Sequence, residues 1–134
     1  MRTMLGAAAV LALTALLATS ARADLDMDAL KDTTPRERAA VQTTMMKKKL
    51  GLTDAEVPKV EAINRKYAEQ ADPVLKGGQG PLVRLREFHR IEDAKEAELK
   101  KVLTPQQFTD YLANKQEMRD KLMDRILEHR KGAF

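Results

Sequence analysis

The stretch Leu52-Thr53-Asp54-Ala55-Glu56 has a near copy further along the chain, Leu103-Thr104-Pro105-Gln106-Gln107, and this pair decides the fold. In each copy the threonine hydroxyl can accept a free backbone N–H of a first helical turn, and the Glu or Gln three residues later can reach back to the threonine N–H. The preceding leucine can pack as a hydrophobic staple on the apolar residue that follows the motif. Both stretches therefore predict helix starts, and Pro105 occupies a first-turn position that tolerates proline.

Outward from these two starts, the chain is rich in helix-forming residues and no window alternates with period two. Thr34-Pro35-Arg36-Glu37 has the same capping logic without the leucine, so it is a degenerate third copy. We expect four helices, and their ranges are about 35–50, 54–72, 81–101 and 105–131. The fold class is therefore all-α, with the helices forming an elongated hairpin arrangement.

Glycine and proline place the expected breaks between these helices. Gly51 and Gly132 are helix stops, and Pro73 is expected to distort or end the second helix. The short glycine-rich connection at 77–80 permits only an antiparallel return. The third helix is expected to carry one apolar stripe, made of Leu82, Leu85, Phe88, Ile91, Leu99 and Val102.

The first helix has two apolar faces. Ala39, Met46 and Leu50 project on one side, and Val41 and Met45 project about 140–180° away from it. A helix that packs on one side needs only one such face. We expect the second face to be a subunit interface or an exposed binding surface. The alternative is that Val41 and Met45 are two scattered surface residues.

The first 23 residues have the layout of a secretory signal peptide: a positive start, an apolar run over 5–18 and a small-x-small site that predicts cleavage after Ala23. The apolar run is shorter than the ~20 residues that a membrane-spanning helix needs. Residues 24–33 are expected to form a flexible lead-in, and 34–134 one all-helical domain. Removing the leader lowers the net charge of +4, because Arg2 and Arg22 leave without any acidic residue, so nucleic acid is not an expected partner.

The composition argues against an enzyme. The chain of 134 residues has no Cys, and its single serine, Ser20, lies in the expected leader. It has neither a His-Glu-x-x-His zinc motif nor a phosphate-binding glycine loop, so we expect no catalytic residues and no cofactor. The two histidines are weak metal candidates: His89 has Asp93 one turn later, and His129 has Arg125 one turn earlier. One histidine and one carboxylate form an incomplete set of ligands.

The two motifs at 52–56 and 103–107 resemble the paired LTxxQ motifs of the Spy/CpxP family of small exported helical proteins. The phrases around Leu50-Gly51-Leu52-Thr53 and Lys101-Val102-Leu103-Thr104-Pro105 are similar to an uncharacterised short branch of that group. The resemblance implies an elongated, curved helical homodimer with coiled-coil-like pairing in the periplasm. It also implies ATP-independent chaperone or envelope-stress activity, with metal-sensing relatives. The first motif departs from the family pattern, because Glu56 stands where the family has Gln.

The sequence thus predicts a periplasmic module that binds non-native or partner proteins. Flexible methionines, exposed aliphatic residues and long cations suit a surface of low sequence preference. The candidate client-binding residues are Val41, Met45, Met46, Lys47, Lys48, Lys49, Arg84 and Arg86. Lys47, Lys48 and Lys49 have a second interpretation, because cations in a last turn also complement the helix dipole. Two other functions stay open: a metal-responsive binding or sensor protein, and a structural docking partner of a membrane sensor.

Overall fold

The computed structural model describes residues 30–132 of the chain, with side chains up to residue 128. The expected signal peptide and most of the expected lead-in lie outside the described residues. Within that range the structure has four α-helices and no strand, which confirms the all-α prediction. The helices are α2 (Pro35–Leu50), α3 (Glu56–Lys76), α4 (Pro81–Val102) and α5 (Pro105–Gly132). In the described part of the chain, none of these helices is long and apolar enough to cross a membrane.

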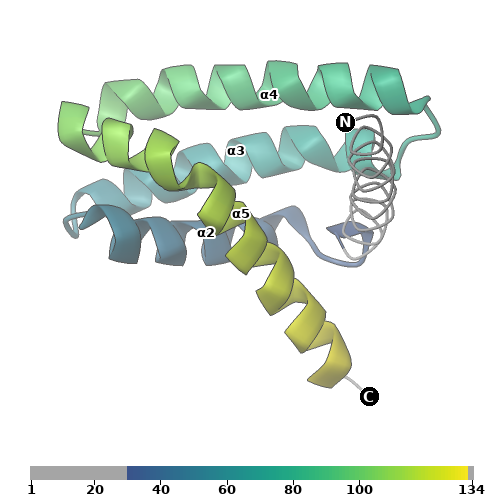
Figure 1. Cartoon of the computed structure of the whole chain (residues 1–134), viewed down its shortest axis with the longest axis horizontal. Coiled ribbons are helices and arrows are strands. Elements are labelled where there is room, and N and C mark those ends of the chain that lie inside the picture. Colours follow the sequence, from purple (N-terminus) through teal and green to yellow (C-terminus); the bar gives the residue numbers. More distant parts are fainter. Residues whose placement is uncertain (1–29, 133–134) are drawn as a thin grey trace, which may run out of the picture.

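Helix α3 lies between α2 and α4, and α5 starts at the end of α4 and crosses toward α2 (Figure 1). The short connection at 77–80 turns the chain back, so α4 runs antiparallel to α3 as expected (Figure 1). An ion pair from Lys66 of α3 to Glu98 of α4, with an N···O distance of 2.6 Å, ties the two helices together. The last turns of α5 extend beyond the other three helices (Figure 1).

Both ends of α2 are the ones that the sequence predicts. Thr34 Oγ1 accepts the N–H of Glu37 at 3.1 Å, and the Glu37 carboxylate accepts the N–H of Thr34 at 2.9 Å, which closes a capping box. At the other end Gly51 has φ 64°, in the left-handed region, and its N–H donates to the carbonyl of Lys47. Glycine adopts this conformation without the steric penalty of a Cβ.

The two leucine-threonine motifs also form the predicted reciprocal hydrogen bonds of a capping box, although in the first motif they span the turn before α3, whose regular helix begins at Glu56. The Thr53 N–H donates to Glu56 Oε1 at 3.1 Å, and the Glu56 N–H donates to Thr53 Oγ1 at 3.3 Å. In the second motif the Thr104 N–H donates to Gln107 Oε1 at 2.9 Å, and the Gln107 N–H donates to Thr104 Oγ1 at 3.1 Å. The hydrogen bond from the Thr53 backbone is the main reason why the pKa of Glu56 is lowered.

The two motifs meet in space, although they lie far apart in the chain. Gln107 Nε2 donates to Glu56 Oε1 at 3.3 Å, so one capping box is hydrogen-bonded to the other. Beneath them Leu52 and Leu103, each 6% exposed, enter the same apolar cluster. We call it cluster 1, and its buried members are Met46, Leu50, Leu52, Val60, Leu99, Leu103, Tyr111 and Met118. Glu56 Oε1 thus accepts both from the Thr53 N–H and from the amide of Gln107.

The substitution Gln107→Glu should place a second carboxylate against Glu56 and lower the thermal midpoint by several degrees at pH 7. Because like charges raise the pKa of one carboxyl in the folded state, that state binds more protons, and the deficit should shrink as the pH falls below about 5. Thermal unfolding at several pH values measures this. Gln70→Glu, at an exposed position of α3, controls for the added charge. Equal losses in both variants would show that the junction contributes nothing.

The second helix differs from its predicted limits. It begins at Glu56 instead of Asp54, and it continues through Pro73 to Lys76. Proline removes one backbone donor, and its ring crowds the carbonyl four residues earlier. Here that carbonyl belongs to Glu69, which is exposed, and Pro73 is exposed as well. Water can therefore satisfy the freed carbonyl, while Val74 and Leu75, 8% and 3% exposed, keep the last turn packed.

The second apolar face of α2 is covered by α5 of the same chain, which corrects the expectation of a subunit interface or an exposed surface. Met45 is 6% exposed, and it packs in an apolar cluster that also includes the partly buried Val41. We call this cluster 2, and its other members are Leu122, Met123, Ile126, Leu30 and Leu127. The sequence reveals that α2 has two faces, but only the crossing of α5 determines what covers the second one.

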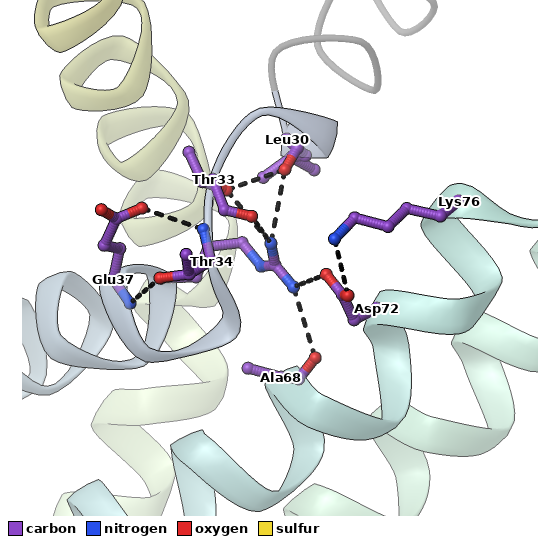
Figure 2. A network of polar contacts seen from close by, with 8 residues as sticks. Leu30, Thr33, Thr34, Glu37, Ala68, Asp72 and Lys76 are labelled. Atoms are coloured by element: carbon purple, nitrogen blue, oxygen red, sulfur yellow. Dashed lines mark hydrogen bonds and ion pairs between the residues drawn. The ribbon is translucent and has the colours of Figure 1, made fainter.

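A buried arginine joins the start of α2 to α3. The Arg38 guanidinium is bonded to Asp72 Oδ1 and to the carbonyl of Ala68, at 3.0 and 3.3 Å, and to the carbonyls of Leu30 and Thr33. Asp72 also accepts a hydrogen bond from Lys76, and Figure 2 shows the carbonyls of Leu30 and Thr33 bonded to the same guanidinium that Asp72 accepts from. Hydrogen bonds from Lys76 and Arg38 hold the pKa of Asp72 below its usual value. The network compensates the burial of the Arg38 charge.

Asn64 in α3 and Lys115 in α5 each interrupt the apolar stripe of their helix, and the two residues are accommodated differently. Asn64 of α3 is 1% exposed, and its amide nitrogen donates to Thr43 Oγ1 at 3.0 Å and to Met46 Sδ at 3.4 Å. Lys115 of α5 keeps its side chain 41% exposed and pairs with Glu96 of α4 at 2.8 Å. One interruption is thus a buried contact to α2, and the other is an ion pair to α4.

Candidate functional site

The apolar half of the predicted client-binding set lies inside the molecule. Met45 and Met46 are 6% and 2% exposed, in clusters 2 and 1, and Val41 is partly buried against cluster 2. These three side chains support the packing of α2 against its neighbours and do not form a surface. Their spacing alone cannot distinguish a covered face from an open one.

The lysine run at the end of α2 is exposed. Lys49 pairs with Glu117 of α5 at 3.1 Å, and Lys47 lies 3.7 Å from the carboxylate of Asp54. Lys48 is exposed between them. All three lie in the last turn of α2, where cations interact favourably with the helix dipole. The run therefore combines a charged surface with a role at the end of the helix.

Exposed apolar side chains gather at the start of α4 instead. Leu82 is 77% exposed, Leu85 54% and Val83 48%. Arg86 is exposed beside them, whereas Arg84 points elsewhere and donates to the carbonyl of Gly77 at 3.1 Å. We call Leu82, Val83, Leu85 and Arg86 the α4 patch. Of the eight candidate residues, only Arg86 belongs to it.

The expected single stripe of α4 is wrong at this end. At 100° per residue Leu82 lies about 180° from Ile91. Ile91 is 7% exposed and packs with Tyr67 and Val74 of α3, so Leu82 points away from the core. The sequence does contain a signal for the patch, which is Val83. Together with Leu82 and Leu85 it spreads the apolar residues over more of the helix circumference than one stripe covers. The expected stripe includes Leu82 and Leu85 but leaves Val83 out, so it misses this signal.

The patch lies in a basic stretch. Residues 76–86 contain Lys76, Arg84 and Arg86 and no Asp or Glu. His89 is exposed on the following turn. Lys76 is paired with Asp72, and Glu87, which follows this stretch, is paired with Arg90, so Arg86 is the cation that belongs to the patch itself. The surface therefore joins apolar area to positive charge.

The two histidines that the sequence offers as metal candidates are not surrounded by further ligands in the part of the chain that the structure describes. His89 and Asp93 are both exposed, and no group of three or more His, Cys, Asp or Glu residues that could hold a metal ion occurs among the described residues. The side chain of His129 lies outside the described residues. The metal-responsive function stays a prediction.

Two buried polar residues escape the sequence analysis. Lys95 of α4 is 7% exposed, and Arg38 of α2 is 5% exposed. Lysine within a run of charges is usually solvated, and nothing in the local pattern of 92–101 marks Lys95 as different. Its burial follows from the crossing of α5, which only the tertiary structure shows.

Comparison with known proteins gives one family. Residues 23–111 match the family described as a domain of unknown function, DUF4890. This range includes α2, α3, α4 and the start of α5. No curated protein and no solved structure matches the chain.

Proposed function

Because the chain belongs to the family described as a domain of unknown function, DUF4890, we propose a function from its surface: the protein binds non-native or partner polypeptides at the α4 patch, without ATP. The observation that carries this proposal is the exposure of Leu82, Val83 and Leu85 within one turn of α4. Single exposed apolar residues are ordinary, but a contiguous group is typical of an interaction site.

The size of the patch suits weak, reversible holding. Fully burying one Leu or Val side chain contributes about 1.5–3 kcal/mol. Three such side chains, less the entropy lost on association, give a modest affinity that lets a polypeptide leave. Holding of this kind needs no sequence-specific pocket.

The charge beside the patch favours one kind of occupant. Arg86 stands beside the apolar side chains, and no acidic residue occurs over 76–86. We therefore expect the patch to prefer extended apolar segments that carry Asp or Glu nearby. Rim charges of this type mainly raise the rate of association and depend on salt.

The resemblance to the Spy/CpxP family supports the same proposal. The paired capping boxes lie in the two stretches that resemble its LTxxQ motifs, and the hydrogen bond between Gln107 and Glu56 gives these two stretches a joint structural role. Export to the periplasm through residues 1–23, a homodimer and a role in envelope stress belong to the proposal as well. An assay of the purified protein tests the binding activity alone, independently of export, dimerisation and envelope stress.

The variant Leu82→Ser with Leu85→Ser should weaken the suppression of client aggregation at least fivefold, at an unfolding free energy within about 0.5 kcal/mol of the parent, because both side chains are exposed. Light scattering of an unrelated heat-denatured enzyme measures this. Leu112→Ser is the matched control, since Leu112 is 42% exposed on α5. Equal suppression by the double variant, or no suppression by the unmodified protein, would contradict the proposal.

A further inference from the structure

A cavity lies under α5, next to the second half of α4. Its volume is about 90 Å³, and it lies between α2, α4 and α5. Helix α5 crosses from α4 to α2 above it (Figure 1). The lining residues are Gln42, Met46, Glu92, Lys95, Tyr111, Lys115, Met118 and Arg119. The cavity has room for more than one water molecule.

The buried Lys95 is the central group of this cavity. Its side chain makes one hydrogen bond, from Nζ to Gln42 Oε1 at 3.3 Å, and no ion pair within 4.0 Å is found for it among the described residues. An ammonium group has three donors, so two of them are left without a protein acceptor. Burial is the main reason why the pKa of Lys95 is lowered. A buried cation in this state favours an anion beside it.

The one carboxylate of the lining, Glu92, and the adjacent carboxylate of Glu96 already have hydrogen-bond or ion-pair partners. Glu92 Oε1 accepts from the Tyr111 hydroxyl at 3.1 Å, and Glu96, next to Lys95 in the chain, pairs with Lys115 at 2.8 Å. Arg119 of α5 is exposed at the mouth of the cavity and has no hydrogen bond or ion pair with another described residue, and its charge adds to the lowering of the Lys95 pKa. Three cations, Lys95, Lys115 and Arg119, line the cavity, and the carboxylates of Glu92 and the adjacent Glu96 balance two of their charges, so one positive charge is in excess.

The geometry points to a binding site for one carboxylate group, held between Lys95 Nζ and the guanidinium of Arg119. A guanidinium presents a planar pair of donors that matches a carboxylate. The nearby charges of Glu92 and Glu96 disfavour a dianion such as phosphate. Met46 and Met118 supply an apolar wall for a short alkyl chain.

The small volume favours a free acid of the size of propionate. The same chemistry can also come from the C-terminal carboxylate of a polypeptide. The site does not depend on the α4 patch, because none of the four patch residues lines the cavity.

Titration with sodium propionate at constant ionic strength tests the site, with ¹³Cε-lysine NMR of the purified protein as the readout. We expect one saturable resonance, assigned through Lys95→Met, and an upward shift of its titration midpoint, because the bound anion favours the charged amine. Lys95→Met should remove the binding, which calorimetry measures without the lysine signal. Arg119→Gln should weaken it at least tenfold, and Lys48→Met, at an exposed position, should leave it unchanged.

Lys95→Met should keep the fold, because it replaces a buried cation by an apolar side chain of similar length. Circular dichroism checks this. A second titration compares N-acetyl-dialanine with its C-terminal amide. Binding of propionate supports a free acid as ligand, and binding of the peptide acid alone supports a polypeptide carboxylate. No saturable binding of either acid, equal binding of the amide, or undiminished binding by folded Lys95→Met would overturn the inference.

Discussion

Replacing Leu99 by alanine should lower the free energy of unfolding by about 3 kcal/mol. Leu99 is 0% exposed in cluster 1, which also holds Leu52 and Leu103, the leucines that precede the two capping boxes. The shortened side chain leaves a cavity where both motifs are anchored, and the loss is a large share of the 5–15 kcal/mol typical of a domain. Urea unfolding followed by circular dichroism measures it.

Leu112→Ala is the control for this substitution. It removes the same atoms from a side chain that is 42% exposed on α5, so the change should stay within about 0.5 kcal/mol. A loss below about 1 kcal/mol for Leu99→Ala, or equal losses in the two variants, would show that cluster 1 is not the centre of the fold.

Met45→Asp should be at least as damaging, with an expected loss of about 3 kcal/mol or more. The substitution puts a carboxylate into cluster 2, where Met45 is 6% exposed and faces Leu122 and Met123 of α5. The loss should be concentrated in the contact between α2 and α5, so amide hydrogens of residues 118–127 should exchange faster than those of α3. Hydrogen exchange followed by mass spectrometry separates the two regions.

The stability of Met45→Asp should also depend on pH. Burial raises the pKa of the new carboxyl, so the folded state binds a proton more readily than the unfolded state. The deficit relative to the parent should therefore shrink as the pH falls toward about 4. Thr44→Asp, at the exposed neighbouring position, controls for the added charge. Unchanged exchange in α5 of Met45→Asp would mean that α5 does not cover this face.

The parts of the fold that the sequence predicts are local. Thr34 with Glu37, Thr53 with Glu56 and Thr104 with Gln107 form their capping boxes because each pair lies within one helical turn. Gly51 ends α2 for an equally local reason, its positive φ. The all-α class and the four helices follow from such signals.

What the sequence does not reveal depends on the tertiary arrangement. The path of α5 over α2 buries Met45, and the turn at 77–80 leaves Leu82 pointing to solvent. The same crossing buries Lys95 beside a cavity, although its neighbours in the chain are solvated charges. Continuation of α3 through Pro73 depends on whether the carbonyl of Glu69 faces water. Residue patterns along a single helix carry none of this information.

Crosslinking to a client tests the central claim most directly. A photoreactive benzoylphenylalanine is placed in turn at Leu82, at Leu85, at Leu112 and at Lys48, all of which are exposed. Each protein is irradiated with a denatured enzyme, and the crosslinked product is quantified by gel electrophoresis. The account predicts strong labelling of the client from positions 82 and 85 and only background labelling from 112 and 48. Equal labelling from all four positions, or labelling from 112 or 48 with none from 82, would contradict it.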